Sequence, residues 1–185
     1  MQKARIRSGG WRIAFAAFGA LLFSTSGAIA RDPQVCFTPG EDCTGIIVDQ
    51  VTSARREVLV QAYSFTSPEI VKALAAAKRR GTDVRVILDK SNTCRDGGDC
   101  EKKGAIAADT LSIAKATVLV DRRHAIAHNK IIIIDGQRAI TGSFNFTRAA
   151  QDKNAENLII IQDEDLARKY RTNWMRHADH SERYE

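Results

Sequence analysis

The sequence predicts an α/β fold in which a mixed, mostly parallel sheet is flanked by helices. Residues 131–134 are four consecutive isoleucines, and such a β-branched apolar run is typical of a strand buried on both faces. Asp135-Gly136 follows the run directly and is a strong hairpin signal. Upstream, residues 57–89 show the pattern strand, helix, strand. That pattern is a βαβ unit, which places neighbouring strands in parallel.

The first thirty residues have the pattern of a secretory signal peptide. Residues 1–12 contain four basic residues and no acidic one, residues 13–23 are mostly apolar, and the segment ends in Ala28-Ile29-Ala30. Cleavage after Ala30 would leave a single domain, residues 31–185, in the periplasm or outside the cell. The apolar run is short for a membrane span, so we favour cleavage, and retention as a membrane anchor is the alternative.

Removal of this segment changes the charge balance. The whole chain has 28 basic and 22 acidic residues, a net charge of +6. Without the four basic residues of the signal, 24 basic residues face 22 acidic ones, which leaves +2. Overall charge therefore does not by itself indicate nucleic-acid binding, and any attraction to phosphate must come from local patches.

The four cysteines all follow the signal segment, and an even number in an exported chain favours disulfides. Three pairings are possible. We expect the local pairs Cys36–Cys43 and Cys94–Cys100, because each would close one polar loop. The spacings lack the C-x-x-C form, so a zinc site built from these cysteines is not favoured.

The other expected elements follow from apolar periodicity and capping residues. Thr44 is the expected cap of the first helix, and Ser67 with Pro68 begins the second, which Gly81 ends. His177 and His180 fall in a polar tail and are expected to be solvated. The predicted helices are 44–56, 67–80, 105–114 and 163–177, and the predicted strands outside the hairpin are 57–63, 83–89, 117–120 and 157–161.

The hairpin gathers polar side chains at one end of its apolar strand. Side chains alternate between faces, so His128 and Lys130 share a face. With Asp135-Gly136 as the turn, Lys130 lies opposite Thr141, and with Gly136-Gln137 it lies opposite Ser143. Either register returns Ser143 and Asn145 to this end, so an imidazole, an ammonium, a hydroxyl and a carboxamide meet there, a set suited to binding phosphate. The alternative interpretation needs no functional site: His128 is then a packed residue and Lys130 a solvated one. Turn chemistry accounts for Asp135 in either case.

The longer pattern resembles the HKD motif of the phospholipase D superfamily. It consists of His128-x-Lys130, then Asp135, then Gly142-Ser143-x-Asn145. Only one copy is present, as in the small bacterial single-motif endonucleases, which pair two protomers to build one site. The resemblance extends to the segments 61–66 and 154–157.

This resemblance implies the superfamily fold, a homodimer and a role for each motif residue. His128 of one protomer would attack phosphorus and form a phosphohistidine, and His128 of the other would protonate the leaving group. Lys130 and Asn145 would bind the non-bridging oxygens with support from Ser143. Glu156 would accept the far ring N–H of His128. Gly142 and Asp135 would be structural, and no metal or cofactor is required.

The substrate is less constrained than the chemistry. The sequence favours nucleic acid, DNA or RNA, because no long amphipathic membrane helix is evident in the mature chain. Arg122 and Arg123, just upstream of His128, are candidate contacts to a polyanion, although a solvated loop explains them equally well. A phospholipid phosphodiester is the second candidate substrate. A phosphate-binding module without turnover is the third interpretation.

Overall fold

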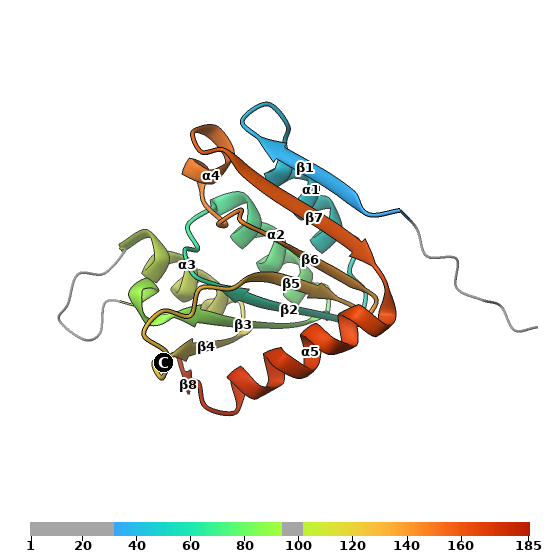
Figure 1. The fold of residues 1–185 in the computed structure, drawn as a ribbon. Helices are drawn as coiled ribbons and strands as arrows, with labels where there is room; N and C mark the ends of the chain where they lie inside the picture. Colours follow the sequence, from blue (N-terminus) through green and yellow to red (C-terminus); the bar gives the residue numbers. More distant parts are fainter. Residues whose placement is uncertain (1–31, 94–101) are drawn as a thin grey trace, which may run out of the picture.

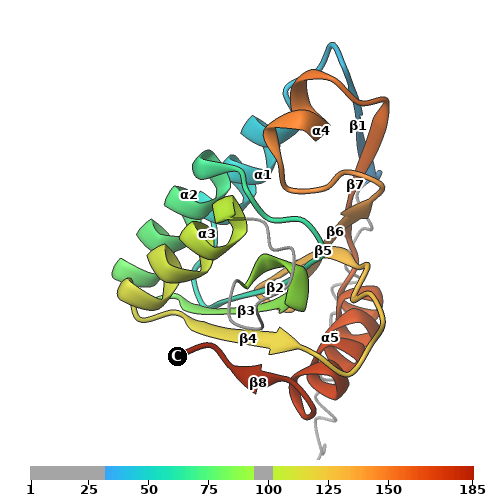
Figure 2. The same cartoon turned by 90° about the vertical axis from the view of Figure 1, so that its left-hand side faces the viewer.

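The computed structural model describes residues 32–93 and 102–185, which form one sheet covered by helices on both faces. Helices α1, α2 and α3 cover one face, and α5 crosses the other (Figures 1 and 2). No helix within the described residues is both long and apolar enough to cross a membrane. The predicted signal segment 1–30 and the predicted pair Cys94–Cys100 lie outside the described residues.

The strands are β1 Gln34–Thr38, β2 Glu57–Ala62, β3 Asp83–Asp89, β4 Thr117–Asp121, β5 Lys130–Ile134, β6 Arg138–Gly142, β7 Glu156–Gln162 and β8 Glu182–Arg183. The helices are α1 Cys43–Thr52, α2 Pro68–Arg79, α3 Lys102–Ile113, α4 Arg148–Asp152 and α5 Glu164–Ala178, with a short 3₁₀ turn η1 at Lys90–Asn92.

The described strands lie in the order β1-β7-β6-β5-β2-β3-β4-β8. The α/β class and the flanking helices are confirmed, but the expectation of a mostly parallel sheet is wrong. Among the described strands, β2–β3 and β3–β4 pair in parallel, whereas the other five pairings are antiparallel. Crossover helices α2 and α3 impose the parallel pairings. The tight hairpin reverses the chain between β5 and β6, and β7 pairs antiparallel with β6 after the short α4 connection.

Strand β5 is buried along its whole length, as four isoleucines predict. Ile132 and Ile134 belong to the larger core under α1–α3, and Ile131 and Ile133 belong to a smaller one under α5. Trp174 of α5 fixes the second layer, because its ring N–H donates to the backbone oxygen of Val60 at 2.8 Å. The predicted double burial is confirmed.

The β5–β6 turn differs from both expected registers. Ile134 pairs with Arg138 and Ile132 with Ile140, so the turn contains three residues rather than two. Asp135 and Gly136 both have positive φ, 55° and 69°. The Asp135 carboxylate accepts the backbone N–H groups of residues 55–57, with donor–acceptor distances of 2.8–3.3 Å. This anchoring to a distant loop selects the turn, and the purely structural role expected of Asp135 stays a prediction.

Element ends depart from the sequence prediction where a distant partner decides them. Helix α1 begins after Asp42, whose side chain accepts from the backbone N of Gly45, and not at the expected cap Thr44. Strand β1 was not predicted and exists through its pairing with β7. The predicted Cys36–Cys43 disulfide is confirmed, with an S–S distance of 2.01 Å, and it joins β1 to α1.

Candidate active site

The site begins where β2 ends and β5 starts. Tyr63 follows β2, and its backbone N–H donates to the carbonyl of Asn129 at 3.0 Å. This bond brings the exposed side chain of His128 against the Tyr63 ring, with centroids 4.7 Å apart. Within the described residues the ring nitrogens of His128 have no hydrogen-bond partner, so both remain available to a substrate.

Lys130 lies beneath the histidine and is only 7% exposed. Its ammonium donates to the carbonyl of His128 at 2.8 Å and lies 5.0 Å from the centre of the Tyr63 ring. Burial lowers the pKa of Lys130, and the nearby charge of Glu156 partly opposes that effect. The result is a desolvated cation and an exposed imidazole that both contact the Tyr63 ring, a combination suited to holding a phosphate anion.

A second group forms where β6 ends beside β7. The Ser143 hydroxyl donates to one oxygen of Glu156 at 2.6 Å, and the Asn154 amide donates to the other at 3.0 Å. Ser143 also accepts the backbone N–H of Asn157 at 3.1 Å. This approach requires Gly142, because a Cβ there would lie 2.2 Å from the Asn157 carbonyl oxygen.

Asn145 lies in the loop between Ser143 and α4. Its side-chain oxygen is buried and has no hydrogen-bond partner among the described residues. The neighbouring Phe146 fixes the loop, because its carbonyl accepts the backbone N–H groups of Thr66 and Ser67, both at 2.9 Å. A buried polar group without a partner is costly, so this amide is a candidate ligand contact.

The structure joins the predicted residues as two groups. His128 and Lys130 form one and Ser143 and Glu156 the other, and the charge of Glu156 acting on Lys130 links them. The three-residue turn replaces both expected registers, so Ser143 reaches this end by leaving the strand at Gly142. Glu156 bonds Ser143 and Asn154, not His128, within the described chain, and its role toward the histidine stays a prediction.

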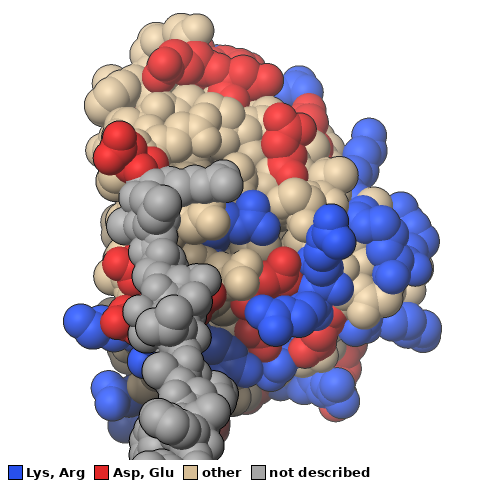
Figure 3. All heavy atoms as spheres, turned by 90° about the vertical axis from the view of Figure 1, so that its right-hand side faces the viewer, with Lys and Arg blue, Asp and Glu red and all other residues tan. Residues whose placement is uncertain are grey.

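The two arginines upstream of His128 have different surroundings. Arg122 pairs with Glu182, with 3.1 Å between Nε and a carboxylate oxygen, whereas Arg123 is exposed. A separate set of basic side chains, Arg55, Arg56, Arg79 and Arg80, lies at the opposite end of β2 and β3. Figure 3 shows that end, where lysines and arginines gather on part of the face beside acidic side chains.

Sequence reasoning missed a groove of about 360 Å³ whose lining includes residues close in sequence to the site. Its basic lining residues are Lys72, Lys103 and Arg148, and Val71 and Ile106 add apolar surface. The groove also contains Thr66, three residues after Tyr63, and Arg148 comes three residues after Asn145. Tyr63 was missed as a site residue too, although its place at the end of a central strand is a common site position.

The sequence and the fold were compared with those of known proteins. Residues 47–177 match the family model described as cardiolipin synthase, PLD-like domain. A phospholipase D of Rickettsia conorii is 44% identical over 142 residues, which cover 77% of this chain and 67% of that protein. The crystal structure of Nuc, a phospholipase D family member from Salmonella typhimurium, has a TM-score of 0.77 at 33% identity and covers 83% of this chain and 98% of Nuc. NucT from Helicobacter pylori, at 21% identity, has a TM-score of 0.71 over 83% of this chain and 99% of NucT, a likeness of fold alone.

Proposed function

The chain belongs to the phospholipase D superfamily and is a phosphodiester hydrolase, and from that premise we propose that it cleaves the backbone of nucleic acid in a site shared by two copies. The observation that carries this proposal is the distribution of histidines. The whole chain has four, and three of them, His124, His177 and His180, contact Asp121. Only His128 is left for phosphoryl transfer, whereas a nucleophile and an acid are both needed. A second protomer supplies the missing imidazole.

The proposed reaction has two balanced steps. A ring nitrogen of His128 attacks phosphorus, the N–P bond forms, and the P–O bond to the leaving alcohol breaks as the partner subunit's His128 donates a proton to that oxygen. Water then attacks phosphorus and gives its proton to the partner's imidazole. The P–N bond breaks, which releases the phosphate monoester and restores both histidines.

The remaining side chains stabilise charge and position the loops. The ammonium of Lys130 neutralises charge on the non-bridging oxygens, and the Asn145 amide binds the same group. Ser143 and Glu156 hold the β6–β7 side of the site, and Glu156 also keeps a negative charge near Lys130. No step in this scheme needs a cofactor.

The basic groove supports a polyanionic substrate. Lys72, Lys103 and Arg148 line it without an acidic residue among the lining side chains, although Arg148 also pairs with Glu69 at 3.6 Å. A nuclease that contacts backbone rather than bases needs this kind of surface. The apolar share of the groove and the names of the Rickettsia relatives favour phospholipid as the second candidate. We further propose that the protein is exported.

The test is nicking of supercoiled plasmid by the purified protein in excess EDTA, at a temperature well below unfolding. The wild type is compared with His128→Ala, and both are also given phospholipid vesicles in a headgroup-release assay. We expect nicking that resists EDTA and disappears in the variant. An alkali-stable, acid-labile adduct between His128 and labelled oligonucleotide would identify the intermediate.

Two results would contradict the proposal. His128-dependent headgroup release without plasmid cleavage would show that the substrate is a phospholipid and not nucleic acid. Nicking that persists in a folded His128→Ala protein would remove the histidine from the reaction. Circular dichroism of both proteins shows whether the variant is folded.

A further inference from the structure

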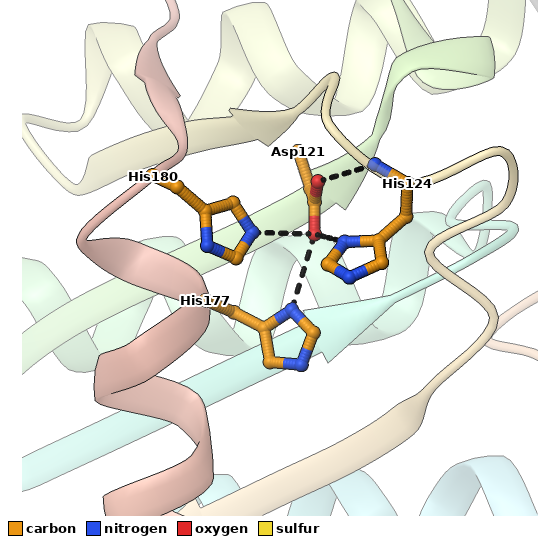
Figure 4. Close-up of side chains that lie close together, drawn as sticks. All are labelled: Asp121, His124, His177 and His180. Atoms are coloured by element: carbon orange, nitrogen blue, oxygen red, sulfur yellow. Dashed lines mark hydrogen bonds and ion pairs between the residues drawn. The ribbon is translucent and has the colours of Figure 1, made fainter.

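The three histidines that the reaction does not use converge on one carboxylate oxygen. Ring nitrogens of His124, His177 and His180 lie 2.8, 3.1 and 3.3 Å from Oδ2 of Asp121. Figure 4 shows the three rings directed at Asp121 from different sides. One ligand atom from each of the four residues lies within 4.8 Å of all the others.

Three separate elements build this cluster. Asp121 ends β4, His124 lies in the loop that leads to His128, and His177 and His180 come from the end of α5 and the turn after it. The expectation that His177 and His180 are solvated is wrong, since their side chains are 17% and 20% exposed. Packing of α5 against the sheet and the pairing of β8 with β4 bring the tail here.

Hydrogen bonding alone does not account for this convergence. Oδ1 of Asp121 already accepts the backbone N–H groups of Arg123 and His124, at 3.1 and 3.3 Å. A carboxylate oxygen has about two lone-pair sites, yet three ring nitrogens point at Oδ2. A cation placed among the four residues would instead take one lone pair from each.

We propose that Asp121, His124, His177 and His180 form a zinc site. Three imidazole nitrogens and one carboxylate oxygen are ligands that suit Zn²⁺, whereas Ca²⁺ and Mg²⁺ prefer oxygen. A tetrahedral site with bonds of about 2.0 Å has ligand–ligand distances of about 3.3 Å. The three distances to Asp121 are already near this value, and small rotations of the imidazole rings would close the rest.

The exposure of the four side chains fits an ion that the protein holds and that enters from solvent. The Asp121 side chain is fully buried, and its charge is oriented by backbone groups. His124 is 44% exposed, which leaves an entry path. Four protein ligands complete a tetrahedron, so the proposed role is structural rather than catalytic.

The ion would cross-link the C-terminal segment to the loop that carries the catalytic histidine. His124 lies four residues before His128, and its carbonyl accepts the Lys90 ammonium at 3.0 Å. The same loop is held at Ala127, whose N–H donates to Asp89 at 2.7 Å. Zinc would add a third anchor and would join this loop to α5.

The experiment uses untagged, unreduced full-length protein that has been stripped of metal. Titration with Co²⁺ reports tetrahedral coordination through its visible absorption, and Zn²⁺ competition gives the affinity. The same titrations are made on Asp121→Asn, His177→Gln and, as the matched histidine control, His128→Gln. Zinc K-edge absorption on the wild type counts imidazole and carboxylate ligands without any variant.

We expect one tetrahedral ion per chain with three nitrogen ligands and one oxygen ligand. Free zinc at a hundred times Kd should raise Tm by roughly 5–10 °C. Asp121→Asn and His177→Gln should weaken binding at least about a hundredfold, because even outer partners change affinity 10- to 100-fold. His128→Gln should bind zinc normally although it cannot cleave, which separates this inference from the proposed reaction.

Two outcomes would overturn the zinc site. One is a folded wild-type protein that shows no tetrahedral cobalt spectrum and no rise in Tm with zinc. The other is binding that survives in both ligand variants, or a K-edge spectrum with sulfur ligands, since either would place the ion elsewhere.

Discussion

At the scale of single residues, Lys130 shows how a site residue opposes stability. Its ammonium is buried, and no carboxylate of residues 32–93 or 102–185 is in hydrogen-bond contact with it, which is unfavourable for folding but useful for binding phosphate. We expect Lys130→Met to lower kcat by roughly 10²–10³-fold and to raise the free energy of unfolding. Steady-state cleavage and urea unfolding measure the two effects, and exposed Lys169→Met on α5 is the matched control.

The same substitution has a pH signature. Because burial lowers the pKa of Lys130, the unfolded chain binds more protons between the folded pKa and the unfolded value of about 10.4. Wild-type stability should therefore gain from this group as pH rises through that window, and Lys130→Met should lack the gain. A variant that cleaves as fast as the wild type would contradict the assigned role.

Asp135 is the motif residue whose contribution we expect to be purely structural. Burial alone would raise its pKa, but backbone hydrogen bonds from residues 55–57 lower it. Its stabilisation is thus present above the unfolded pKa of about 3.9 and is lost as pH falls through the folded pKa. We expect Asp135→Asn to lose about 1–2 kcal/mol at neutral pH. The free energy of unfolding of this variant should vary less with pH in the acid range than that of the wild type. Its kcat per folded molecule should be unchanged. Urea unfolding from pH 7 to acid tests this, and a loss of kcat without a loss of stability would refute it.

At the scale of elements, two glycines of the β5–β6 hairpin give a matched pair. Gly142 has φ of 145° and a Cβ there would lie 2.2 Å from a backbone oxygen, whereas Gly136 has φ of 69° and open space around it. We expect Gly142→Ala to cost roughly 3 kcal/mol or more and to displace Ser143, and Gly136→Ala to cost about 1 kcal/mol. Equal costs in urea unfolding would show that the contact at Gly142 is easily relieved.

Elements with local signals were predictable, and those decided by distant partners were not. Strand β3 was predicted at its observed bounds, and the cap Ser67 was found, because apolar periodicity and capping chemistry lie within a few residues. The hairpin register was missed because Asp135 is bound by backbone groups about 80 residues away. Strand β1 was missed for the same reason, since its partner β7 comes more than a hundred residues later.

The candidate site shows the same division. His128, Lys130, Ser143 and Asn145 could be grouped from the sequence because one hairpin brings them to one end of the sheet, and their roles stay predictions. The cluster around Asp121 could not be, because His177 is 56 residues from its partner in sequence. Only the packing of α5 across the sheet closes that distance, and sequence spacing carries no signal of it.

At the scale of the whole molecule, the shared site predicts a particular result of mixing subunits. If each reaction needs His128 from both protomers, a dimer with one His128→Ala subunit is inactive. After subunit exchange in a fixed total of protein, activity should follow the square of the wild-type fraction, about one quarter at equal parts. Independent sites would leave about one half. Light scattering of the same mixtures verifies the dimer. The proposed zinc ligands are unchanged in both subunits, so a linear dependence would reject the shared site without bearing on the zinc proposal.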